Sequence, residues 1–126
     1  MKLKLGKEKR LKSRKSIDRL FLSGRRIQKF PLKAVYHIDS ISAPEFRVAV
    51  SVPKKLFKKA VQRNLLKRRM REAFRQNQYK LQLNGNLEIM FIYSTNEIHD
   101  FQKIESAMLA LIGSLNSISI DNNSEK

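Results

Sequence analysis

The chain has 126 residues, the length of one domain with a single modest hydrophobic core, and it is too short for two such domains. Its 27 lysines and arginines exceed its 11 aspartates and glutamates, so the formal net charge is +16. That excess predicts a polyanionic partner. The hydrophobic content of 41% is ordinary for a globular protein, which excludes a chain that is only a disordered basic tail.

The sequence also excludes several classes of site and location. It has no cysteine, so it forms no disulfide and no thiolate metal site, which fits a reducing cytoplasm. The basic N-terminus leads into no apolar run of signal-peptide length, and no stretch approaches the ~18 apolar residues of a membrane span. We therefore expect a cytoplasmic protein with no membrane partner.

Patterns typical of catalytic and metal sites are missing as well. The two histidines, His37 and His99, lie far apart and outside any H-x-x-x-H or paired-carboxylate context. The four glycines form no phosphate-binding loop. We expect no catalytic residue and no metal ligand in this chain.

The positive charge is concentrated in the first part of the chain. Residues 1–75 contain 24 basic and 5 acidic side chains, a net charge of +19, whereas residues 76–126 contain 3 and 6, a net charge of −3. The first part should therefore contact the partner. Residues 1–12 alternate charged and small apolar groups and are expected to form a flexible basic arm.

A short helix is predicted over residues 14–23. Ser13 or Ser16 is a suitable N-cap, and Gly24 suits the position that follows the last turn. The apolar residues at helical spacing are Ile17, Leu20 and Phe21.

Two strands are predicted after a basic turn that contains Arg25, Arg26 and Lys29. Residues 32–38 and 46–52 alternate or are β-branched, and Pro53 ends the second run. We expect these two strands to pair as a hairpin across a loop at residues 40–45.

The strongest helix prediction covers residues from near Phe57 to about Tyr79, which contain no glycine or proline and many good helix formers. A turn at 84–86 and a buried strand over 87–93 should follow. Asp100 can cap a last helix. Its predicted apolar stripe comprises Phe101, Ile104, Met108, Leu111, Ile112 and Leu115. Residues 13–115 then form the domain, with a loose tail over 116–126.

The long helix separates a positive face from an apolar one. At 100° per residue, its polar band spans an arc of roughly 140°. That band comprises Arg63, Asn64, Lys67, Arg68, Arg71 and Arg75, and nearby lysines Lys54, Lys55, Lys58 and Lys59 extend it. Leu66, Met70 and Ala73 project on a different side, which should pack on the sheet.

Stacking like charges at i, i+4 costs a few tenths of a kcal/mol per pair, so an external polyanion should offset the repulsion. Alternatively, the positive face binds no partner and is simply solvated. A DNA-recognition helix is a further interpretation, but the sequence shows no helix-turn-helix spacing, zinc-ligand pattern or heptad zipper to support it. Asn64 either makes a local cap-like bond or reads RNA.

The motif around this helix resembles the protein subunit of bacterial ribonuclease P. The resemblance begins with the run Ser51-Val-Pro-Lys-Lys55 and continues over residues 59–75, whose core is Arg63-Asn64, Lys67-Arg68 and Arg71-Glu72. Features nearer the N-terminus also resemble the family and occur in the same order along the chain as in the family. They are Arg10-Leu11, Ile17, Leu20-Phe21, Gly24 and Val35-Tyr36. The resemblance covers about residues 8–115.

The resemblance implies an α+β fold, a ribosomal-protein-like two-layer α–β sandwich with three helices and a mixed sheet of about four strands. It also implies a left-handed βαβ crossover, where general topology favours the right hand. It implies a subunit of a ribonucleoprotein endoribonuclease, whose partners are a catalytic RNA and precursor tRNA. The RNA and its Mg²⁺ cleave to form the mature 5′ end of tRNA, and the protein takes no cofactor and no small-molecule substrate.

The resemblance also implies residue roles. The basic helix docks on the catalytic RNA, and a cleft between the first helix, the sheet and the basic helix holds the single-stranded 5′ leader of the substrate. The implied cleft residues are Phe21, Tyr36, Ile17, Lys67 and Arg71, with the two aromatic rings stacking on bases. From burial tendencies alone, Phe21 and Tyr36 would be core residues. A ribosomal or ribosome-assembly rRNA-binding protein and a protein nuclease are the rival functions.

Overall fold

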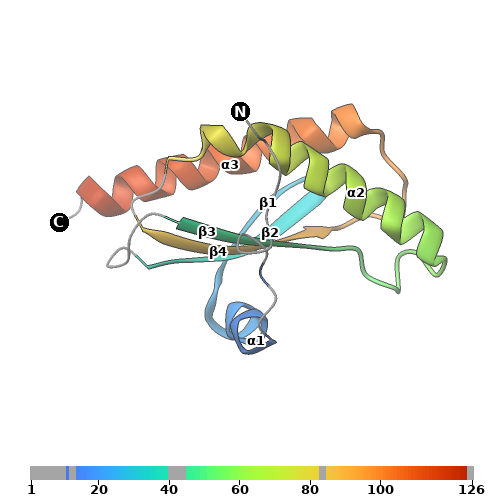
Figure 1. The fold of residues 1–126 in the computed structure, drawn as a ribbon, viewed down its shortest axis with the longest axis horizontal. Coiled ribbons are helices and arrows are strands. Elements are labelled where there is room, and N and C mark those ends of the chain that lie inside the picture. The colour runs from blue at the N-terminus through green and yellow to red at the C-terminus, as the bar shows by residue number, and fades with distance from the viewer. Residues whose placement is uncertain (1–10, 12–13, 40–44, 83–84, 125–126) are drawn as a thin grey trace.

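The computed structural model describes residues 11, 14–39, 45–82 and 85–124, with side chains described as far as residue 118. Two helices lie on one face of a sheet and a third, shorter helix lies on the other face (Figure 1). In chain order the elements are α1 (Arg14–Ser23), β1 (Arg25–Lys29), β2 (Leu32–Asp39), β3 (Glu45–Ser51), α2 (Ala60–Asn77), the 3₁₀ helix η2 (Gln78–Lys80), β4 (Asn86–Tyr93) and α3 (Phe101–Ser124).

The sheet has four strands in the order β1-β2-β4-β3. β2 pairs antiparallel with both β1 and β4, whereas β3 pairs parallel with β4. Because parallel neighbours need a crossover connection, α2 joins them as the helix of a βαβ unit. The predicted α+β architecture with a mixed four-stranded sheet is confirmed.

The predicted hairpin between the second and third strands is wrong. β4 lies between β2 and β3 and pairs with both of them. β4 takes the central place because nearly all of its residues are buried, on both faces of the sheet. The basic turn predicted near Arg25 is instead strand β1, which forms a hairpin with β2. Its charged residues suit an edge strand, because they discourage pairing with another chain.

The main core fills the space between the sheet and the pair α2 and α3. Alternate residues of β2 and β4 point into it, as the two-residue period of a strand requires. Phe74 of α2 is fully buried there, with its ring 5.5 Å from that of Phe46 and 5.6 Å from that of Phe91. A smaller cluster beneath α1 comprises Leu11, Leu20, Val35 and Met90.

The two predicted ends of the domain differ from the structure where it can be compared with them. α3 continues through Ser124, so residues 116–124 are helical where a loose tail over 116–126 was expected. The Asn116 side chain accepts a hydrogen bond from the Gln82 amide (2.8 Å) and donates one to the Lys80 carbonyl (2.9 Å), which anchors this part of the helix. Most of the expected arm over 1–12 lies outside the described residues. Leu11 is described, and its amide donates to the Val48 carbonyl at 2.8 Å.

The loop between β4 and α3 is held by partly buried hydrogen bonds. The hydroxyl of fully buried Tyr93 donates to the Glu97 carbonyl (2.6 Å) and accepts from the His99 amide (2.9 Å). Burial raises the pKa of Tyr93, so the hydroxyl keeps its proton well into the alkaline range. The Arg69 guanidinium donates to the His99 carbonyl at 2.6 Å, which ties α2 to the same segment. These contacts fix the orientation of α2 on the sheet.

Gly24 should be intolerant of a side chain, because a Cβ there would lie 2.5 Å from the Leu20 carbonyl oxygen and 2.9 Å from Val35 Cγ1. We expect Gly24→Ala to lower the free energy of unfolding by about 1–3 kcal/mol, as overpacking does. Gly113→Ala is the matched control, since nothing lies within 4 Å of its position on α3. That control should be neutral or stabilise by up to ~1 kcal/mol. Equal melting temperatures for Gly24→Ala and wild type would refute the tight packing of α1 on the sheet.

Candidate nucleic-acid interface

α2 presents different chemistry to the core and to solvent. Leu66, Met70 and Ala73 are fully buried, as predicted. Asn64, Arg68 and Arg71 are exposed, and Lys67 is half-buried on the flank between the two sides. Among the described residues, Lys67, Arg68 and Arg71 form no ion pair with a carboxylate. Their charges are therefore available to an external anion.

Arg63 acts on the loop before α2. Its guanidinium donates to the carbonyls of Phe57 (2.8 Å) and Lys58 (2.9 Å). The Pro53 carbonyl accepts from the Leu56 and Phe57 amides, at 3.1 and 3.4 Å, which closes a turn in the same loop. The loop holds exposed lysines at four of its positions: Lys54, Lys55, Lys58 and Lys59. Arg63 thus orders the loop that displays these charges, and α2 begins at Ala60 rather than near Phe57.

Arg75 differs from the other cations of the predicted band. Its guanidinium is paired with Glu72 of the same helix through two nitrogens, with Nη2 at 2.9 Å from Oε2. The hydrogen bond from Arg75 lowers the pKa of Glu72 below its ordinary value. Because this pair offsets one positive charge, the strongest cationic surface lies nearer the middle of α2, at Lys67, Arg68 and Arg71.

On the opposite face of the sheet, α1 presents an aromatic ring. Phe21 is 43% exposed, and Ile17 is half-buried against the small cluster under the helix. Arg19 of α1 forms an ion pair with Glu88 of β4 at 2.8 Å, which holds the helix against the sheet. Phe21 is therefore an accessible ring on a fixed element.

Tyr36 is placed apart from Phe21. It is only 3% exposed and belongs to the main core under α2 and α3, so it offers no ring to the α1 face. Val35 is the neighbouring residue that faces α1. Successive residues of a strand point to opposite faces, so a register difference of one residue exchanges the two roles. Tyr36 therefore lies on the other face of the sheet from Ile17 and Phe21, with which it was predicted to line one cleft.

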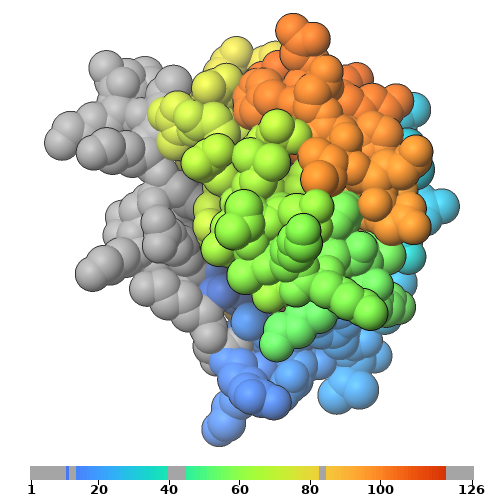
Figure 2. All heavy atoms as spheres, turned by 90° about the vertical axis from the view of Figure 1, so that its right-hand side faces the viewer, coloured from blue at the N-terminus to red at the C-terminus, as the bar shows by residue number. Residues whose placement is uncertain are grey.

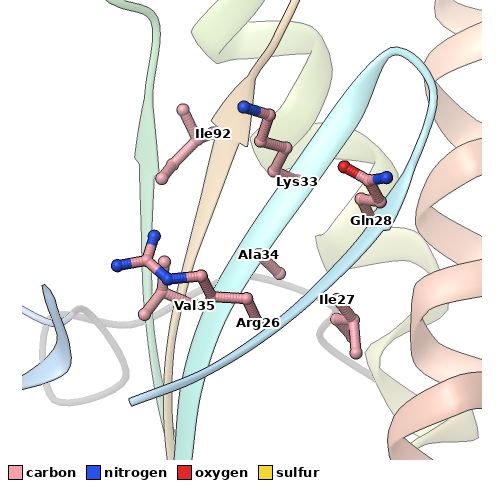
Figure 3. A pocket seen from close by; sticks show the side chains of 7 residues that line it. All are labelled: Arg26, Ile27, Gln28, Lys33, Ala34, Val35 and Ile92. Atoms are coloured by element: carbon pink, nitrogen blue, oxygen red, sulfur yellow. The ribbon is translucent and has the colours of Figure 1, made fainter. Parts of the chain in front are cut away.

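A pocket of about 420 Å³ opens on the α1 face of the sheet. Figure 3 shows Arg26 and Gln28 of β1, Lys33 and Val35 of β2, and Ile92 of β4 around it. Neither Arg26, which was predicted to lie in a turn, nor Lys33, which lies in a predicted strand, had been assigned a role from the sequence. The alternation of Arg26 and Gln28 about Ile27 is the signal that would have indicated a strand there.

The basic surfaces lie on an accessible side of the molecule. Figure 2 views the molecule from one side, and from there both α1, in blue, and the first turns of α2 with the loop before it, in green, are visible at the surface. Within the part of the chain that the structure describes, no group of three potential metal ligands occurs. None of the described helices has the length and apolar character needed to cross a membrane.

The fold and the surface together define a class: a small α+β domain that mounts an oriented cationic helix for contact with a polyanion. Comparison with known proteins is specific within that class. The sequence profile of the family described as Ribonuclease P matches residues 5–116. The chain is 40% identical over 116 residues to the ribonuclease P protein component of Porphyromonas gingivalis, with 82% of this chain and 80% of that protein covered. The chain belongs to the ribonuclease P protein family.

Further relatives agree in sequence and in fold. The ribonuclease P protein component of a Picosynechococcus species is 31% identical over 108 residues, with 83% of this chain and 91% of that protein covered. The structure of the RNase P protein from Thermotoga maritima superposes with a TM-score of 0.68 at 26% identity and covers 82% of this chain and 94% of that one. An RNase P protein from Staphylococcus aureus has the same fold, with a TM-score of 0.69, 21% identity and coverage of 83% and 93%.

Proposed function

We propose that this chain is the RNA-binding subunit of a ribonucleoprotein that cleaves precursor tRNA at its mature 5′ end in the cytoplasm. The observation that carries the proposal is the cationic surface of Lys67, Arg68 and Arg71, which pair with no carboxylate among the described residues. It lies on a helix whose other face is packed into the core. The partner RNA, with its Mg²⁺, performs the hydrolysis, and this chain contributes affinity and orientation. The family to which the chain belongs favours this role over binding to ribosomal RNA.

In this proposal the two sides of the domain bind different RNA segments. The outer face of α2 and the lysines of the preceding loop contact phosphates of the catalytic RNA. The α1 face of the sheet holds the single-stranded leader of precursor tRNA, with Phe21 as a stacking platform for a base. Lys67 and Arg71 supply charge between the two, and Ile17 packs beneath α1. Tyr36 has no such role here, because its ring is buried in the main core.

Reconstitution tests the proposed function. The chain is combined with a ribonuclease P RNA at a low Mg²⁺ concentration, and cleavage of precursor tRNA is followed with and without protein. We expect the protein to accelerate cleavage at the mature 5′ end and to tighten substrate binding. Equal rates with and without the protein would overturn the proposal, and so would equal activity of the protein in the absence of RNA.

Phe21→Ala should weaken binding of substrates that carry a leader. Loss of one base stack corresponds to ~1–3 kcal/mol, so we expect a Kd increase of about fivefold or more. The fold should tolerate the change because the ring is 43% exposed and the Arg26 bond goes to the Phe21 backbone carbonyl. Leu22→Ala, at a neighbouring side chain that is 88% exposed, is the control and should bind as wild type does. An unchanged Kd for the Phe21 variant would remove stacking from the account.

A further inference from the structure

The first turns of α2 carry two apolar side chains within the positive surface. Val61 and Leu65, which we call the apolar pair, lie at i and i+4 and are therefore neighbours along one side of the helix. Val61 is 78% exposed, and Leu65 is half-buried. Neither side chain belongs to the hydrophobic clusters that the described residues form. The apolar pair therefore does not serve the core.

Helix formation does not explain Val61 either. Valine is a poorer helix former than alanine, lysine or arginine, because its branched side chain is restricted against the preceding turn. If only the stability of the helix mattered, an exposed position in α2 would favour one of those residues. Single exposed apolar residues are ordinary on protein surfaces. Two neighbours on the face that meets the proposed partner indicate a contact instead.

The apolar pair lies beside groups that can bind RNA. At 100° per residue, one arc of roughly 100° on the outer side of α2 contains Asn64, Arg68, Val61 and Leu65. Asn64 and Arg68 are exposed. Within the described part of the chain the Asn64 side chain forms no hydrogen bond, so its amide is free to donate and to accept. The absence of a local bond favours the second of the two roles that the sequence left open for Asn64.

The charges around the apolar pair favour RNA as its partner. Every charged residue from Lys54 to Arg69 is positive. A second copy of the chain would bring the same cations against these, and like charges would oppose that contact. An RNA strand meets both requirements, because its phosphates can bind the cations while a base packs on the apolar side chains.

We infer that the apolar pair packs on an unpaired nucleotide of the catalytic RNA and that the Asn64 amide bonds to the edge of its base. Side chains cannot read the deep, narrow major groove of duplex RNA, whereas an unpaired base exposes both a face and an edge. Arg68 binds a neighbouring phosphate. The helix thus recognises the RNA by a base as well as by charge. The inference rests on the proposed function, because it requires that the outer face of α2 meets the catalytic RNA.

The salt dependence of binding to a ribonuclease P RNA separates an apolar contact from a phosphate contact. Loss of a phosphate contact changes the slope of log K against log salt, because fewer counterions are released on binding. Loss of an apolar contact lowers the association constant equally at every salt concentration. We expect Val61→Ser with Leu65→Gln to raise Kd about tenfold with an unchanged slope. Serine and glutamine match the helix propensities of the residues they replace, so the melting temperature of the free protein should stay the same.

Leu22→Gln is the matched control, because it makes the same change on α1 at a side chain that is 88% exposed. It should leave Kd unchanged. Chemical modification of Watson–Crick base edges in the assembled complex gives a second measurement, with Val61→Ser alone. That position is 78% exposed, so the variant should fold as wild type does. We expect the wild-type protein to protect an unpaired base that this variant leaves reactive.

Several results would overturn the inference. If the double variant binds the RNA as wild type does, or if Val61→Ser gives the wild-type protections, the apolar pair does not contact a base. A higher Kd with a smaller slope would mean that phosphate contacts were lost. An equal loss for the control would mean that exposed apolar surface acts without regard to its position. If wild type neither binds the catalytic RNA nor stimulates cleavage of precursor tRNA, the proposed function itself fails.

Discussion

Replacing Arg68 and Arg71 together with alanine should weaken binding to the catalytic RNA by about 100-fold and leave the melting temperature of the free protein unchanged. Both side chains are exposed, and neither forms an ion pair among the described residues. A hydrogen bond to a charged group contributes ~1.5–3 kcal/mol, or about tenfold in Kd for each arginine. Filter binding or fluorescence titration over a range of salt concentrations measures the effect. The slope of log K against log salt should fall by roughly 2, as two phosphate contacts are lost.

The control for this double variant is Lys80→Ala with Lys103→Ala, which removes the same charge from η2 and α3. If the control weakens RNA binding as much as the α2 variant does, the effect reflects overall charge and not an oriented surface. A lower melting temperature for the α2 variant would also contradict the account, since neither arginine supports the core.

On the opposite side of the same helix, Phe74→Ala should lower the free energy of unfolding by about 3–5 kcal/mol. The ring is fully buried and packs edge-on against Phe46 of β3 and at a tilt against Phe91 of β4. Its removal leaves a cavity between α2 and the two parallel strands that α2 connects. Because small domains are stable by only ~5–15 kcal/mol, denaturant melts should show a large drop in the unfolding midpoint.

Tyr79→Ala is the control for the core variant, because that aromatic side chain is 67% exposed just beyond α2. It should change stability by no more than ~0.5 kcal/mol. Equal losses for the two variants would mean that Phe74 does not anchor α2 on the sheet. If Phe74→Ala weakened RNA binding and left stability unchanged, the RNA would bind the face of α2 that we assign to the core, which would contradict the proposed docking.

The two faces of α2 could be predicted from the sequence because the helix is long and uninterrupted. Over 18 residues, a period of 3.6 separates buried from exposed positions clearly. Leu66, Met70 and Ala73 are buried as predicted. Individual roles were harder to predict, because Arg63 binds loop carbonyls and Arg75 pairs with Glu72. A helical wheel gives the direction of a side chain and not the groups that it meets.

The sheet was predicted less well, because strand pairing is not encoded in sequence order. β2 and β3 follow one another in the chain, but the apolar β4 inserts between them. The predicted place of Tyr36 on the leader side differs from the structure by one residue, because Val35 and not Tyr36 faces α1. Leu32, Ala34 and Tyr36 share a face of β2, while Lys33, Val35 and His37 share the other, and this alternation is visible in the sequence.

Directed cleavage tests most directly whether the outer face of α2 docks on the catalytic RNA. The chain has no cysteine, so one introduced cysteine provides a single attachment point for a hydroxyl-radical probe. We would place the probe at Arg68 on α2 or at exposed Ala110 on α3, and map strand breaks in the assembled complex. We expect breaks in the catalytic RNA from position 68 and none from position 110. Breaks from position 110 alone, or breaks from position 68 confined to precursor tRNA, would contradict this docking.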